Sequence, residues 1–115
     1  MAPNKVDTLR KVPLFSHCSP RELEFLSTQM DEVSLNPGRV LIEEGQSTES
    51  FFVLLAGEVE VTRKGRPVRR MAAGDFFGEI GMLDRGSATA TVKTTQPAAA
   101  LVMSHAQFRD AIKAN

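Results

Sequence analysis

The chain has 115 residues, in which 14 Lys and Arg balance 14 Asp and Glu, with two His, one Cys and neither Trp nor Tyr. A net charge of zero argues against a nucleic-acid-binding protein, which normally carries a basic excess, and a single cysteine excludes an internal disulfide and favours a reducing compartment. No apolar run approaches the ~20 residues of a membrane helix and no apolar leader is present, so we expect one cytoplasmic domain over residues 1–115.

The N-terminal part of the chain, residues 6–30, has the pattern of helices. Apolar residues from Val6 to Val12 follow approximate helical spacing, and Pro13 limits the continuation of this first helix. Ser19-Pro20 is an N-cap followed by proline at the first helical position, which predicts the start of a second helix.

From Asp31 the apolar period changes to two, which is typical of strands. The expected strands cover residues 31–35, 39–43, 51–55, 58–62, 68–71, 89–94 and 98–103. Short strands at spacings of about 8–12 residues indicate an antiparallel sandwich or barrel. Ser104 is expected to cap a C-terminal helix over residues 105–113 that carries Phe108 and Ile112. The fold class is therefore α+β.

The segment from Gly74 to Leu83, Gly-Asp-Phe-Phe-Gly-Glu-Ile-Gly-Met-Leu, interrupts the strand pattern. Gly78 to Leu83 can form one helical turn, whose free backbone N–H groups would make an anion site. Glu79 suits such a site if its carboxylate accepts hydrogen bonds from sugar hydroxyls while the N–H groups hold a phosphate. Taken alone, this motif is most often a surface turn, so its context decides the interpretation.

Five segments in order along the chain supply that context. They are Leu9–Ser16 with its Pro-Leu-Phe step, Leu35–Gly38, Phe52–Val59 ending in Gly-x-Val, Gly74–Leu83 and Thr89–Val92. Together, over about residues 7 to 113, they resemble the cyclic nucleotide-binding domain of bacterial catabolite activator proteins, protein kinase A regulatory subunits and cyclic nucleotide-gated channels. The resemblance implies a mainly β domain: an antiparallel eight-stranded jelly-roll barrel, residues 31–103, flanked by N- and C-terminal helices.

The resemblance also implies a cyclic nucleotide as ligand, with cAMP favoured over cGMP, and no other cofactor. The segment Gly74–Leu83 matches the start of the family's phosphate-binding cassette, whose glutamate binds the ribose 2′-hydroxyl, and this assigns the role to Glu79. The backbone contacts to the phosphate would come from Gly78, Ile80 and Gly81. The alternative for Glu79 is an ordinary carboxylate at a helix start, where the dipole favours it.

The neighbouring strands supply further contacts by the same resemblance. A small hydroxyl residue reaches the phosphate in the family, and Thr89, followed by Ala90, matches that position. Val68 and Arg69 match the strand that runs beside the purine. The alternative for Thr89 is a strand residue without a binding role.

One departure from the family lies at Ala88, where relatives carry the arginine that pairs with the phosphate. An unpaired desolvated charge costs about 2–5 kcal/mol in binding. The nearest arginine is Arg85, in a loop that Gly86 loosens, and Arg69 is a weaker substitute. Two hypotheses follow: a regulatory module that binds a cyclic nucleotide and transmits a conformational change, or a degenerate fold without nucleotide affinity that acts as a protein-interaction module.

The family's further helix, which covers the pocket as a lid, has no counterpart before the chain stops at Asn115. We therefore expect a protein partner or a second copy to supply the lid or the output, and no nucleic-acid or membrane partner. We expect no enzyme and no metal site, because His17 and His105 lie near opposite ends of the chain and Cys18 has no activating base nearby.

Overall fold

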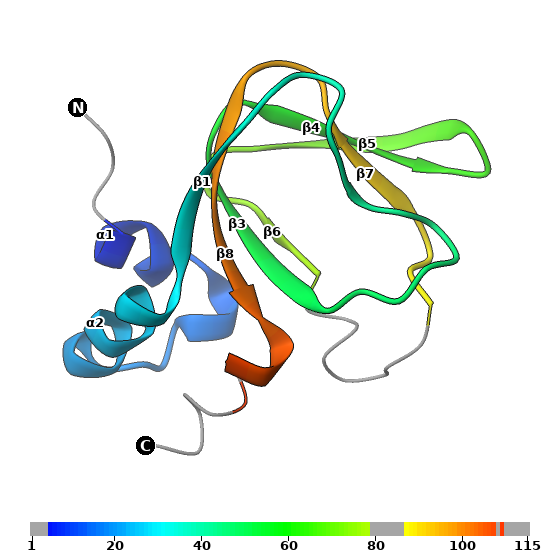
Figure 1. Cartoon of the computed structure of the whole chain (residues 1–115). Helices are drawn as coiled ribbons and strands as arrows, with labels where there is room; N and C mark the ends of the chain where they lie inside the picture. The colour runs from blue at the N-terminus through cyan, green and yellow to red at the C-terminus, as the bar shows by residue number, and fades with distance from the viewer. Residues whose placement is uncertain (1–4, 79–86, 108, 110–115) are drawn as a thin grey trace.

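The computed structural model describes residues 5–78, 87–107 and 109, and within them eight strands form two four-stranded antiparallel sheets (Figure 1). One sheet has the order β1-β8-β3-β6 and the other the order β2-β7-β4-β5. The strands are β1 (Asp31–Leu35), β2 (Val40–Ile42), β3 (Ser50–Ala56), β4 (Glu58–Arg63), β5 (Arg66–Ala72), β6 (Phe76–Phe77), β7 (Thr91–Thr94) and β8 (Ala98–Ser104).

The prediction of a mainly β, antiparallel domain with few helices is confirmed. No ladder between strands of the two sheets is found in the described residues, so the closed jelly-roll barrel stays a prediction. Two strand predictions need correction. β7 begins at Thr91 rather than Thr89, and the pair Phe76–Phe77 forms a strand that the sequence did not indicate, because two residues are too few to show an alternation.

Three helical segments precede the sheets: α1 (Lys5–Arg10), a 3-10 turn η1 (Pro13–Phe15) and α2 (Pro20–Gln29). A capping box starts α2, since the Glu22 N–H donates to Ser19 Oγ (3.2 Å) and the Ser19 N–H donates to Glu22 Oε1 (2.8 Å). Residues 105–107 and 109 are also helical, and the other residues of the predicted C-terminal helix, among them Phe108 and Ile112, lie outside the described residues. None of the described helices has the length and apolarity needed to cross a membrane.

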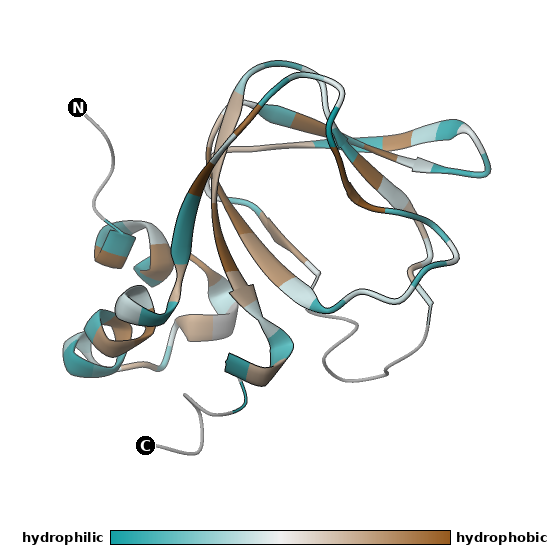
Figure 2. Ribbon diagram, in the orientation of Figure 1, coloured by the Kyte–Doolittle hydropathy of each residue, from teal (hydrophilic) through white to brown (hydrophobic). Residues whose placement is uncertain are grey.

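Strand β3 lies at the centre of the core and is buried on both faces. Phe51 and Val53 point toward the helices and pack with residues such as Leu9 and Leu23, whereas Leu54 packs with Val59 of the other sheet. Figure 2 shows the hydrophobic residues concentrated along β3 and its neighbour β8. This double burial explains why residues 51–55 form an uninterrupted apolar run, as strands covered on both faces do.

The turn between β5 and β6 docks on β3 through backbone hydrogen bonds. The Gly74 N–H donates to the Leu54 carbonyl (2.8 Å), and the Leu54 N–H donates to the Asp75 carbonyl (2.9 Å). The Asp75 carboxylate closes the turn by accepting from the Ala72 N–H (2.8 Å). The Gly74-Asp75 turn is thus fixed to the core strand just before Gly78.

Candidate functional site

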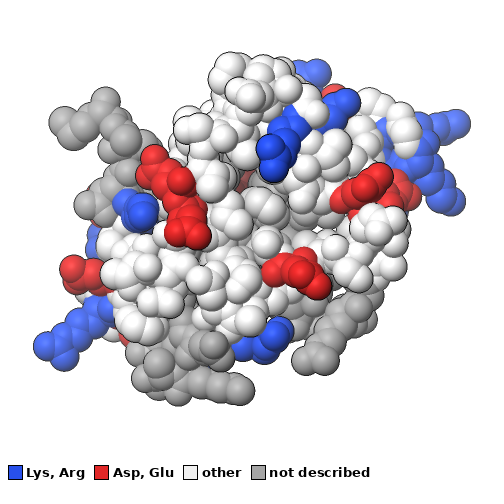
Figure 3. Space-filling view, viewed as in Figure 1, with Lys and Arg blue, Asp and Glu red and all other residues white. Residues whose placement is uncertain are grey.

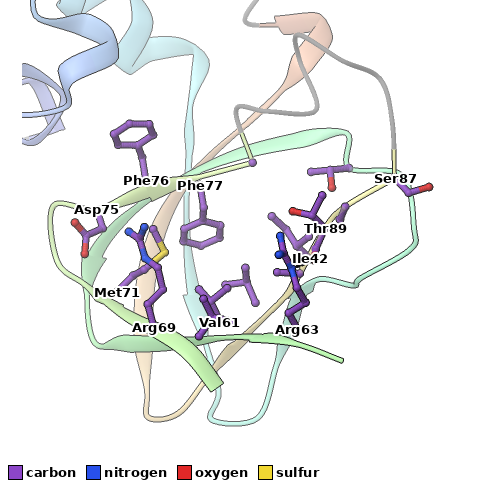
Figure 4. A pocket seen from close by; sticks show the side chains of 16 residues that line it. Ile42, Val61, Arg63, Arg69, Met71, Asp75, Phe76, Phe77, Ser87 and Thr89 are labelled. Carbon is purple, nitrogen blue, oxygen red and sulfur yellow. Dashed lines mark hydrogen bonds between the residues drawn. The ribbon is translucent and has the colours of Figure 1, made fainter. Parts of the chain in front are cut away.

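A cavity of about 500 Å³ opens beside β6 and the start of β7 (Figure 4), within the range of roughly 300–1,000 Å³ typical of small-molecule sites. The residues that line it come from several segments between positions 42 and 92 that are separated in the sequence. The lining residues are Ile42, Thr48, Val61, Arg63, Val68, Arg69, Met71, Asp75, Phe76, Phe77, Gly78, Ser87, Ala88, Thr89, Ala90 and Val92.

The floor of the cavity is apolar because alternate residues of several strands face it. Phe77 points into the cavity whereas Phe76 points the opposite way (Figure 4) and packs near Phe51, with ring centroids 6.0 Å apart. Phe77 is held by stacking on Phe52, its partner in β3, at 5.0 Å between centroids and 16° between planes. Val68 adds an apolar side chain at the opening, where it is 57% exposed.

Gly78 forms one edge of the cavity and needs to be glycine for two reasons. Its φ of +93° is disfavoured for residues with a side chain. A Cβ at this position would also lie 2.3 Å from the Ser50 carbonyl oxygen of β3. The Gly78 carbonyl accepts a hydrogen bond from Nε2 of the buried His105 (2.9 Å), and the His105 N–H donates to the Glu49 carbonyl (2.8 Å). The edge of the cavity is therefore tied to the helical residues after β8.

The opposite edge is the loop of residues 87–90. Ala88 is fixed through its backbone, because its N–H donates to the Gln46 carbonyl (2.8 Å) and its carbonyl accepts from the Gly45 N–H (2.9 Å). Within the described part of the chain, the backbone N–H groups of Thr89 and Ala90 donate no hydrogen bond. Two backbone donors next to an apolar floor can receive an anionic or polar group of a ligand.

The charged side chains that line the cavity in the described residues are Arg63, Arg69 and Asp75. No carboxylate pairs with either arginine among these residues, although the neighbouring Arg70 contacts Glu58 at 3.6 Å. The cavity wall carries a net positive charge of one unit from these three groups, which favours an anionic ligand.

Six of the ten residues singled out in the sequence lie together around this cavity. They are Gly78, Val68, Arg69, Ala88, Thr89 and Ala90. The other four, Glu79, Ile80, Gly81 and Arg85, lie outside the described residues. The sequence carries no motif that marks Arg63, one of a basic group at the β4–β5 hairpin, or the floor residues as ligand contacts. The alternation of apolar and polar residues over 58–62 predicts that Val61 lies on one face of a strand. Only the order of the strands in the sheet shows that this face lines a cavity.

No group of His, Cys, Asp and Glu able to hold a metal ion is found among the residues that the structure describes. Cys18 packs against the helical core rather than the cavity. Burial, and next the nearby Glu22 carboxylate, raise the pKa of the Cys18 thiol above its usual value, which disfavours the reactive thiolate.

The chain is similar to proteins of a known family. The family profile described as Cyclic nucleotide-binding domain matches residues 32–115. The cAMP-dependent protein kinase regulatory subunit of Aspergillus fumigatus is 36% identical over 86 residues, which are 73% of this chain and 21% of that protein. The cGMP-dependent protein kinase of Eimeria tenella is 32% identical over 108 residues, which are 93% of this chain and 11% of that protein. The chain belongs to the cyclic nucleotide-binding domain family.

A solved structure gives the same fold at low sequence identity. The regulatory domain of Toxoplasma gondii PKA with cAMP superposes with a TM-score of 0.87 at 16% identity, covering 94% of this chain and 44% of that one. The resemblance to this family noted from the sequence is confirmed by the family profile and by the curated relatives. This chain spans about a fifth or less of the two kinase relatives described above.

Proposed function

We propose that the cavity binds a cyclic nucleotide, with cAMP favoured over cGMP, and that binding changes the packing of the neighbouring helices. The observation that carries this proposal is the combination of an apolar floor, two arginines at its edge, and the backbone N–H groups of Thr89 and Ala90, which donate no hydrogen bond within the described residues. The floor suits a base and the edge suits a phosphate. Membership of the cyclic nucleotide-binding family supports the same ligand class.

Within this proposal each site residue has a role. Thr89 and Ala90 offer backbone donors, and the Thr89 hydroxyl a further one, to the cyclic phosphate. Val68 and Arg69 lie on β5 beside the purine. Glu79 takes the ribose 2′-hydroxyl, with Gly78, Ile80 and Gly81 as backbone contacts, as the family resemblance implies.

Within this proposal, His105 connects the edge of the cavity to the helical residues after β8, which would transmit the change. Its ring is bonded to Gly78 and its backbone to Glu49, so a ligand that moves the Gly78 edge also biases the residues after β8. Such a ligand shifts the population between two packings. We propose that a protein partner or a second copy of the chain in the cytoplasm binds differently to the two packings. We also propose that residues 1–115 act as one ligand-binding unit, with a jelly-roll barrel over residues 31–103. The chain itself is proposed not to be an enzyme. Relatives named as kinase regulatory subunits support the protein partner.

Calorimetric titration of the chain with cAMP and with cGMP tests the ligand. Binding of cAMP at micromolar concentrations and weaker binding of cGMP are expected. An Ala88→Arg variant, which restores the family's arginine, should bind cAMP about tenfold more tightly than an Ala88→Gln control of similar bulk. No heat and no thermal shift with either nucleotide at millimolar concentration would refute the proposal and favour the degenerate interaction module.

A further inference from the structure

The ligand proposed above carries a negative charge, yet position 88, where the family resemblance implies an arginine, holds alanine. Around the cavity, the described cations are Arg63 at the end of β4 and Arg69 within β5. Their positions relative to the loop of residues 87–90 differ. That loop carries the two backbone N–H groups that donate no hydrogen bond to another described residue, so the cation nearest to it is the one able to share an anion with them.

Arg63 is bonded to this loop. Its Nε–H donates to the Thr89 carbonyl at 3.1 Å, a contact between residues 26 apart in the sequence. Figure 4 shows the side chain extending from β4 toward Thr89. Because Nε is used for this anchor, the two terminal Nη groups keep their N–H donors for another acceptor. A guanidinium fixed by one nitrogen presents the remaining donors in a set plane, which suits the oxygens of a phosphate.

The surroundings of Arg63 leave its charge available. No carboxylate pairs with it in the described residues, in contrast to Arg70, whose guanidinium lies between Glu58 and Glu60 at 3.6 and 4.0 Å. The hairpin beyond it carries further cations, and Figure 3 shows Lys and Arg gathered at the tip of β4 and β5. The Glu44 carboxylate also reaches this hairpin, where its Oε1 accepts from the backbone N–H of Lys64 (2.9 Å), but within the described residues it forms no ion pair with Arg63.

We propose that Arg63 supplies the guanidinium for the anionic group of the ligand, in place of the arginine that Ala88 lacks. The backbone N–H groups of Thr89 and Ala90 bind the same group from the adjacent side. The cation of this site thus comes from the end of β4 rather than from the loop before β7. This inference rests on the proposed function, because it assigns a residue to the phosphate of the same ligand.

The test compares Arg63→Gln with Arg66→Gln. Gln at position 63 keeps an amide N–H for the Thr89 carbonyl and removes the charge. Arg66 pairs with Arg63 in the ladder of the same hairpin and does not line the cavity, so it is a matched control for net charge. Each variant is titrated by calorimetry with cAMP and with adenosine, which lacks the phosphate.

Arg63→Gln should weaken cAMP binding about tenfold or more, as expected for loss of a charge-assisted hydrogen bond. Adenosine binding should be unchanged, and Arg66→Gln should bind both ligands like the parent chain. Arg63→Lys should keep part of the cAMP affinity because it retains the charge without the planar fork. Unchanged cAMP affinity in Arg63→Gln, an equal loss of adenosine affinity, or a tenfold loss in Arg85→Ala instead would overturn the assignment.

A second measurement separates this assignment from the proposed function. Inorganic phosphate is titrated into isotope-labelled chain while the amide resonances of Thr89 and Ala90 and the Nε–H resonance of Arg63 are followed by NMR. If no cyclic nucleotide binds but phosphate shifts these resonances in the parent chain and not in Arg63→Gln, the ligand proposal fails and the Arg63 anion site stands. If neither ligand produces a shift, both proposals fail.

Discussion

Replacing Gly78 by alanine tests how the edge of the cavity is built. The added Cβ would lie 2.3 Å from the Ser50 carbonyl oxygen, about 1 Å closer than an ordinary contact of about 3.4 Å. The Ser50 carbonyl group cannot easily move away, because it belongs to the backbone of β3, where Ser50 is paired with Ser104 of β8. The backbone must therefore shift in a tightly packed part of the fold.

The matched control is Gly74→Ala, at the turn that precedes β6. Gly74 has a φ of +96°, nearly the same as the +93° of Gly78, but nothing lies within 4 Å of a Cβ built there. The unfavourable φ costs each variant about 1–2 kcal/mol. Overpacking typically adds about 1–3 kcal/mol, so we expect Gly78→Ala to lose about 2–5 kcal/mol and Gly74→Ala about 1–2 kcal/mol.

Urea denaturation followed by circular dichroism measures both losses. A chain of this length has a free energy of unfolding of roughly 6–17 kcal/mol, so Gly74→Ala should stay folded and Gly78→Ala should be folded but clearly weakened. Equal losses in the two variants, within about 0.5 kcal/mol, would refute the argument that the close approach to β3 makes Gly78 necessary.

Two further predictions concern the ends of helical segments. The pKa of Glu22 is lowered below its usual value, first by the hydrogen bond from the Ser19 backbone N–H and second by the hydrogen bond with the Ser19 hydroxyl. The ionised carboxylate therefore stabilises the fold above the unfolded-state pKa, and this stability is lost as the pH falls through the folded-state pKa. The urea midpoint should exceed that of Glu22→Gln at about pH 7, and the difference should shrink as the pH falls through the lowered pKa of Glu22. A difference that does not change with pH would contradict the capping role. His105→Ala removes the donor to the Gly78 carbonyl and should cost about 1–3 kcal/mol of unfolding free energy in urea. A loss of less than about 0.5 kcal/mol would mean that this hydrogen bond does not hold the cavity edge.

Much of the fold could be predicted because local patterns encode it. The alternation of apolar and polar residues over 58–62 predicted β4 almost to its observed bounds, because one face of that strand is exposed to solvent. Ser19-Pro20 marked the start of α2, since the capping box involves residues only three apart. The two-residue strand β6 was missed because its pairing with β3 depends on the position of a distant strand.

The candidate site was partly predictable for a related reason. Gly78 and Thr89 stood out because they belong to a short, ordered motif, and both line the cavity. Arg63 carried no such signal. It lies in a hairpin whose basic residues are indistinguishable from solvated charges in the sequence.

The sequence by itself determined the positions of most strands and helices, although not β6 or the start of β7, and which family the chain resembles, because turns, caps and apolar periods depend on neighbouring residues. Only the tertiary structure decided that β3 is covered on both faces and that Arg63 reaches Thr89. Both are contacts between distant segments, and they follow from the strand order rather than from any local preference. The missing arginine at position 88 was visible in the sequence, whereas the cation that lies beside that position was visible only in three dimensions.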